Sequence, residues 1–77
     1  MMSLETRING RLIGVANVRN TLISDEPGYD LYEIKYLRMD GDPPIVEFNV
    51  LHKREDGAEA LALLVYQEID RELKNSK

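Results

Sequence analysis

Two runs in the middle of the chain, 30–38 and 45–52, alternate apolar and polar residues, with a polar loop at 40–44 between them. Such alternation is typical of strands that cover a core with one face. One register suits both faces. It pairs Tyr36 with Val46, Ile34 with Phe48 and Tyr32 with Val50 on one face, and Lys35 with Glu47, Leu37 with Ile45 and Leu31 with Leu51 on the other. Cross-strand pairs of these kinds contribute about 0.2–1 kcal/mol each. A slip by one residue would place Glu47 on the core face, so the register of this hairpin is predicted as well.

A second hairpin is predicted near the N-terminus by the dipeptide Asn9-Gly10, which lies between two apolar-rich runs. Asn-Gly favours a type I′ turn, because both central residues of that turn need a positive φ. A regular two-residue loop pairs Ile8 with Arg11, Thr6 with Ile13 and Leu4 with Val15, and places Leu4, Ile8, Ile13 and Val15 on one face. The run 12–19 also has a helical pattern, but its glycine and β-branched residues favour a strand. Residues 24–28 have the composition of a turn.

The C-terminal third of the chain predicts one amphipathic helix, from Asp56 to about Leu73. Asp56 is a good N-cap, and Glu59 three residues later completes the pattern of a capping box. Neither proline nor glycine follows Ala58, and apolar residues recur at helical spacing: Leu61, Ala62, Val65, Tyr66, Ile69 and Leu73. The chain is therefore expected to form a single small α+β domain over 1–77, with an antiparallel sheet of three to four strands in two hairpins. The C-terminal helix packs on one face of that sheet.

A chain of 77 residues has a small core, because it buries only about 60 % of its unfolded surface. Domains of this size often rely on a disulfide, a metal or a second subunit. The sequence contains no cysteine and a single histidine, so neither a disulfide nor a thiolate or histidine-rich metal site is expected, and no cofactor is predicted. Self-association is the support that remains.

Charge disfavours nucleic acid as the partner of the whole molecule, because the net charge is −4 and phosphate binding needs a basic footprint. Three arginines nevertheless lie in the first quarter of the chain, at Arg7, Arg11 and Arg19, and they support the alternative of a nucleic-acid-associated regulator. The stretch 25–42 is acidic, which supports a third alternative, an inhibitor or decoy that docks a basic protein. The usual explanation for both charge groups is a solvated surface.

No residue pattern predicts catalysis. Nucleophilic catalysis needs a nucleophile beside a positioned base, and two of the three serines lie near the termini. We interpret His52 as a strand-end histidine that packs at the edge of the core. Asp40 and Asp42 lack the further ligands of a calcium loop.

Apolar residues in excess of the predicted core indicate a contact surface. The first half of the helix is apolar nearly all round, so one candidate surface is a helix flank that comprises Leu63, Leu64, Gln67 and Arg71. The second candidate is the open face of the sheet, with Leu31, Leu37, Ile45 and Leu51. We expect a non-enzymatic protein-binding module that forms a homodimer through one of these surfaces. Neither a membrane span nor a signal peptide is predicted, and a cytoplasmic location is expected.

Overall fold

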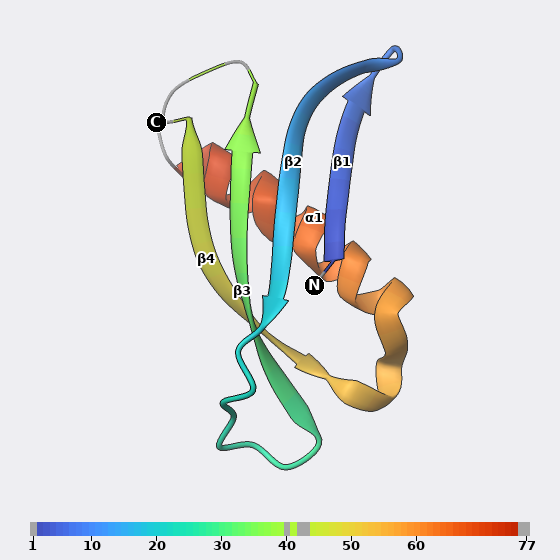
Figure 1. Ribbon diagram of the computed structural model, residues 1–77, viewed down its shortest axis with the longest axis vertical. Coiled ribbons are helices and arrows are strands. Elements are labelled where there is room, and N and C mark those ends of the chain that lie inside the picture. Colours follow the sequence, from blue (N-terminus) through green and yellow to red (C-terminus); the bar gives the residue numbers. More distant parts are fainter. Residues whose placement is uncertain (1, 40, 42–43, 76–77) are drawn as a thin grey trace.

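The computed structural model describes residues 2–39, 41 and 44–75. In chain order it contains four strands, a short 3-10 turn and one helix: β1 (Met2–Ile8), β2 (Arg11–Asn20), β3 (Tyr29–Arg38), β4 (Ile45–Lys53), η1 (Arg54–Asp56) and α1 (Gly57–Asn75). Each strand pairs antiparallel with the next, in the order β1-β2-β3-β4, so the sheet is a meander with β1 and β4 at its edges (Figure 1). The predicted α+β architecture is confirmed, and residues 12–19 belong to a strand.

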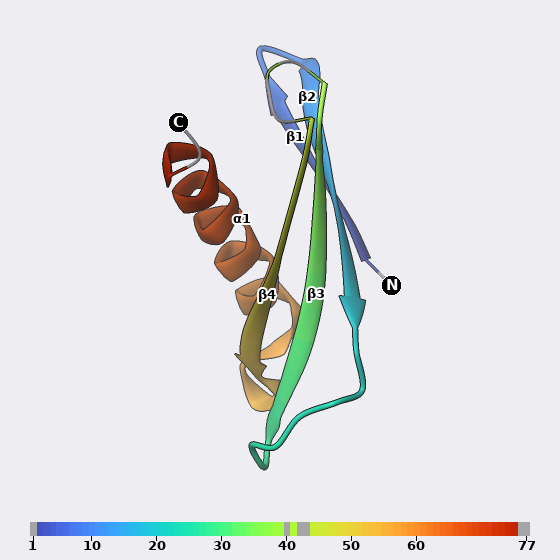
Figure 2. The same ribbon diagram turned by 90° about the vertical axis from the view of Figure 1, so that its left-hand side faces the viewer.

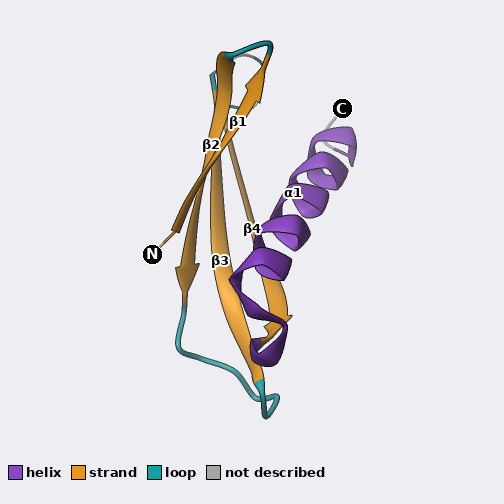
Figure 3. Ribbon diagram, turned by 90° about the vertical axis from the view of Figure 1, so that its right-hand side faces the viewer, coloured by secondary structure: helices purple, strands orange, loops and turns teal. Residues whose placement is uncertain are grey.

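The molecule has two layers. Helix α1 crosses one face of the sheet diagonally, and the opposite face carries no other element of the described chain (Figures 2 and 3). The shortest extent of the molecule, 18 Å, matches the thickness of one helix packed on one sheet. One face of the sheet is therefore a core surface and the other is open to its surroundings.

The predicted register of the second hairpin is confirmed at all six pairs, from Leu31 opposite Leu51 to Leu37 opposite Ile45. The pairing continues for nine residues without a bulge, as far as Tyr29 opposite Lys53. The loop residues Asp40 and Asp42 lie outside the described part of the chain.

The first hairpin has the predicted turn but not the predicted register. Asn9 and Gly10 have φ of 53° and 81°, as a type I′ turn requires. A β-bulge then inserts Ile13, so that Leu4 pairs with Ala16 instead of Val15. The prediction that Leu4 shares a face with Val15 is therefore wrong.

The turn and the pairing with β3 require opposite alternations of side chains along β2, and the bulge allows both. A regular ladder from the turn would place Ile13 and Val15 on the core face. Pairing with β3 places Ala16 opposite Tyr36 and Val18 opposite Ile34 on that face. One extra residue lets both ladders form, because it reverses the alternation between the turn and the rest of the strand.

The core lies between the sheet and the helix and contains eight buried hydrophobic residues: Ala16, Val18, Ile34, Tyr36, Val50, Leu61, Val65 and Ile69. They come from β2, β3, β4 and α1, whereas β1 contributes only half-buried side chains such as Met2 and Leu4. The helical stripe predicted from Leu61 to Leu73 thus faces the sheet, although Tyr66 lies on its exposed margin.

The helix begins at Gly57, directly after Asp56, and ends at Asn75. The predicted capping box does not form among the described side-chain hydrogen bonds. Instead, Asp56 is the last residue of η1, and the Gly57 N–H donates to the Arg54 carbonyl. Gly57 has φ of 85°, a conformation that glycine adopts at little cost, and there the chain turns from η1 into α1.

Gly14 should resist substitution, because a methyl group there would collide with the Tyr36 ring that lies over it. We expect Gly14→Ala to lower the free energy of unfolding by about 1–3 kcal/mol, measured by urea denaturation. In a Tyr36→Leu background the same change should cost clearly less, because the obstacle has gone. Equal costs in the two backgrounds would contradict this account.

Candidate functional site

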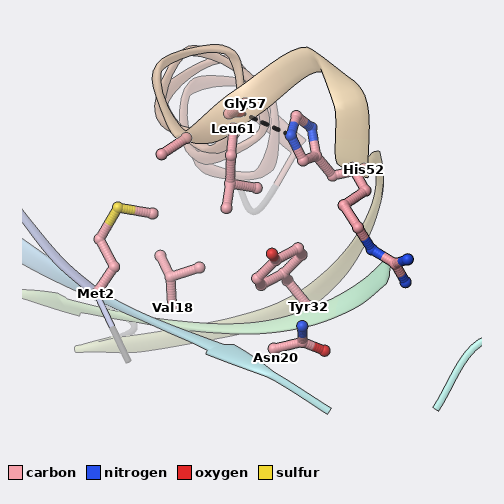
Figure 4. A pocket seen from close by; sticks show the side chains of 9 residues that line it. Met2, Val18, Asn20, Tyr32, His52, Gly57 and Leu61 are labelled. Carbon is pink, nitrogen blue, oxygen red and sulfur yellow. Dashed lines mark hydrogen bonds between the residues drawn. The ribbon is translucent and has the colours of Figure 1, made fainter. Parts of the chain in front are cut away.

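A cavity of about 350 Å³ opens where the end of β4 meets the start of α1 (Figure 4). It lies at the edge of the core and has a mainly apolar lining: Met2, Val18, Asn20, Tyr32, His52, Arg54, Gly57, Ala58 and Leu61. Met2 and Val18 point into it from the sheet, and Leu61 points into it from the helix.

His52 connects β4 to the helix beside this cavity. Its side chain is buried, and Nε2 lies 2.9 Å from the Gly57 carbonyl oxygen. A carbonyl only accepts, so Nε2 is the donor and carries the proton. The imidazole also meets the Tyr32 ring edge to face, with centroids 6.2 Å apart. The interpretation of His52 as a residue packed at the edge of the core is confirmed.

Asp30 and Arg54 form a second link at the same junction. Arg54 donates through Nη2 to Oδ1 at 2.9 Å and through Nε to Oδ2 at 3.3 Å. This hydrogen-bonded guanidinium lowers the pKa of the Asp30 carboxyl below its ordinary value of 3.8. The Arg54 N–H also donates to the Gly28 carbonyl, so the junction is held by main chain and side chain together.

The chemistry of this junction is that of a structural clasp. No serine, threonine or cysteine is among the nine residues that line the cavity, and Arg54 engages both oxygens of Asp30. Within the part of the chain that the structure describes, no three acidic, histidine or cysteine residues are grouped to hold a metal ion.

The three arginines of the nucleic-acid alternative do not gather. Arg7 pairs with Glu5 at 3.2 Å and Arg19 pairs with Glu33 at 3.2 Å. Arg7 lies opposite Leu12, so along β2 it stands about 20 Å from Arg19. Arg11 lies at the hairpin tip, where the alternation places it on the helix side of the sheet.

The acidic stretch 25–42 is also divided. Asp25 and Glu26 are exposed in the loop between β2 and β3, whereas Asp30 and Glu33 pair with arginines. Its other acids, Asp40 and Asp42, fall outside the described residues.

On the open face, the four predicted leucine and isoleucine positions form two separate pairs. Leu37 lies opposite Ile45 at one end of the ladder, and Leu31 lies opposite Leu51 at the other, about 20 Å away. Val15 extends the first pair across three strands, because it lies opposite Leu37. Polar residues separate the two pairs: Asn17, Arg19, Glu33, Lys35, Glu47 and Asn49.

On the helix flank, the predicted residues differ in exposure. Leu63 is 62 % exposed, but Leu64 is half-buried and packs against the core. Gln67 and Arg71 are exposed, and Arg71 pairs with Glu68 at 3.4 Å. The two predicted surfaces thus lie on opposite faces of the molecule. The sequence alone does not predict this difference in exposure, because periodicity cannot show how far the sheet extends beneath Leu64.

No helix in the described part of the chain is long and apolar enough to cross a membrane. Comparison of the chain with protein-family models, with curated proteins and with solved structures finds no match. The surfaces themselves are therefore the basis for a functional proposal.

His52 should contribute to stability through the Gly57 carbonyl. We expect His52→Leu to lower the free energy of unfolding by about 0.5–1.5 kcal/mol, because it removes the part-buried hydrogen bond to that carbonyl. Hydrogen exchange should accelerate first in the opening turn of α1. Lys53→Ala, at the exposed neighbouring position, serves as the control and should change little. Equal losses in the two variants would contradict a specific role for the imidazole.

The Asp30–Arg54 pair should make stability depend on acidity. Because the folded pKa of Asp30 is lowered, its contribution is present above the unfolded pKa, near 3.8, and is lost as the pH falls through the lower folded pKa. Thermal melts of the wild type should therefore decline more steeply below about pH 4 than those of Asp30→Asn. Parallel decline of the two proteins would exclude this contribution.

Proposed function

We propose that this chain is a non-enzymatic protein-binding module that acts as a homodimer. The observation that supports it is the ratio of exposed to buried apolar side chains. Nine large hydrophobic side chains are exposed among the described residues, against eight buried hydrophobic residues in the core. A second subunit is a common way for a domain of this size to cover such surface.

The open face of the sheet offers a better contact surface than the helix flank does. Leu37 and Ile45 are 42 % and 52 % exposed, and with Val15 they form a continuous apolar row across three strands. On the helix, Leu63 is exposed, but Leu64 is half-buried and packs against the core. Contiguous apolar surface marks an interface better than a single leucine does.

The test is the oligomeric state. Light scattering coupled to size exclusion should give twice the chain mass of 8.9 kDa, and dilution should dissociate the dimer. A monomer at every concentration up to submillimolar would overturn the proposal.

Three glutamate substitutions then locate the contact. Ile45→Glu should weaken association, because it buries a charge in the interface. Leu63→Glu and Leu22→Glu, at positions that are 62 % and 87 % exposed, should leave the dimer intact. All three should keep the unfolding free energy within about 0.5 kcal/mol of wild type. Dissociation by Leu63→Glu alone would assign the contact to the helix flank instead.

A further inference from the structure

The two edge strands of the sheet are protected unequally. An edge strand exposes backbone donors and acceptors to which another chain can pair, and proteins usually block it with bulges, charges or a covering element. Strand β1 has all three devices. It pairs through a bulge at Thr6/Arg7, it carries the Glu5–Arg7 ion pair, and the Tyr66 hydroxyl donates to the outward Glu5 carbonyl at 3.0 Å.

Strand β4 presents a regular edge. The Arg38 N–H donates to the Pro44 carbonyl and the Arg54 N–H donates to the Gly28 carbonyl. Even-numbered residues of β4 therefore bond to β3, and the N–H and C=O groups of the odd-numbered residues point outward. These residues are Ile45, Glu47, Asn49, Leu51 and Lys53. Neither a bulge nor a proline interrupts β4.

The helix leaves this edge open. It lies on one face of the sheet, and in the view from the β4 side it stands beside the strand, which overlaps only the start of the helix (Figure 2). An extended chain could therefore align with β4 in the plane of the sheet.

The side chains of β4 complement those of a second β4 that runs antiparallel. When Phe48 lies opposite Phe48 of the other copy, Ile45 lies opposite Leu51 on the open face. On the helix face, Val46 lies opposite Val50. Glu47 then lies opposite Asn49, so apolar residues meet apolar residues and polar residues meet polar residues. The residues with outward backbone groups also face each other, which allows about eight hydrogen bonds between the strands.

Other registers are worse. The outward N–H and C=O groups of the two β4 strands face each other only in registers that differ from this one by an even number of residues, so the nearest alternatives are shifts by two residues in either direction. A shift in one direction places Glu47 opposite itself, where like charges repel. A shift in the other direction places Glu47 opposite Leu51 and Ile45 opposite Lys53.

We propose that β4 pairs with β4 of a second copy, about a two-fold axis through Phe48, and so forms one continuous sheet across the dimer. This inference rests on the proposed homodimer and moves its contact from the open-face apolar row to the β4 edge, where Ile45 is the member of that row that meets the second copy. A closed two-fold pairing also removes the regular β4 edge, which carries charges but neither a bulge nor a covering side chain among the described contacts, because each β4 covers the other.

A pair of engineered cysteines tests the register, since the chain has none of its own. In the double variant Ile45→Cys/Leu51→Cys, each cysteine should face its counterpart at a Cα separation of about 5.5 Å, which a disulfide can bridge. Within one strand the two positions are about 20 Å apart and cannot pair. Mild oxidation should therefore yield a covalent dimer on a non-reducing gel. Each single variant is the control and should remain uncrosslinked, whereas equal crosslinking of a single variant would overturn the register.

Proline substitutions on the two edge strands test whether β4, and not β1, forms the contact. Asn49→Pro removes one outward N–H of β4 without breaking a bond to β3, so it should raise the dimer dissociation constant about tenfold or more while circular dichroism still reports the native fold. Ser3→Pro makes the matched change on the blocked β1 edge and should leave dimerisation unchanged.

The outcomes separate the two proposals. A wild type that is monomeric at all concentrations removes both. A dimeric wild type that neither crosslinks through the cysteine pair nor responds to Asn49→Pro overturns β4 pairing, and it leaves the homodimer to another surface. If Asn49→Pro does not fold, the cysteine pair, on exposed side chains, decides the question alone.

Discussion

A single helix has to cover one whole face of a four-stranded sheet, and the rest of the structure depends on that constraint. The helix buries Leu61, Val65 and Ile69 in a core that β2, β3 and β4 complete, while β1 stays half-buried. On β2 the core-facing positions include Gly14 and Ala16, and the ring of Tyr36 lies over the glycine and fills the space that a side chain would take. The core is therefore concentrated under the helix, and apolar surface elsewhere has no intramolecular partner.

The helix is fixed most firmly at its start. The bond from His52 to the Gly57 carbonyl and the Asp30–Arg54 pair lie within one turn of the point where β4 ends. Beyond Ile69 the contact is carried by half-buried side chains such as Leu73. The cavity beside His52 therefore lies at the most firmly held part of the helix, and the buried imidazole is found there because its Nε2 bonds to the Gly57 carbonyl.

Patterns of local origin were predictable from the sequence. The register of β3 and β4 was predictable because a slip by one residue would place Glu47 on the core face and lose the matched cross-strand pairs, and the buried face of the helix was predictable from its spacing. The bulge at Ile13 was not, because the turn and the third strand make opposite demands on β2 that only the assembled sheet reveals. Among the candidate contact residues, Ile45 and Leu63 are exposed, whereas the half-burial of Leu64 could not be predicted because it depends on where the helix lies on the sheet. Which edge of the sheet is blocked depends on Tyr66 reaching Glu5, a contact between distant parts of the chain.

The bulge also marks the position in β2 at which the chain could lose one residue without turning side chains to the other face of the sheet. Removal of Ile13 would leave Arg7 opposite Leu12 and Thr6 opposite Gly14 in one uninterrupted ladder, at the cost of the hydrogen bond from the Met39 N–H to the Ile13 carbonyl. Every side chain beyond the gap would keep its face. A one-residue deletion at Asn17, in contrast, would turn the core residues on one side of it out to solvent. Related sequences of different length should therefore differ at position 13 before they differ anywhere else in the sheet.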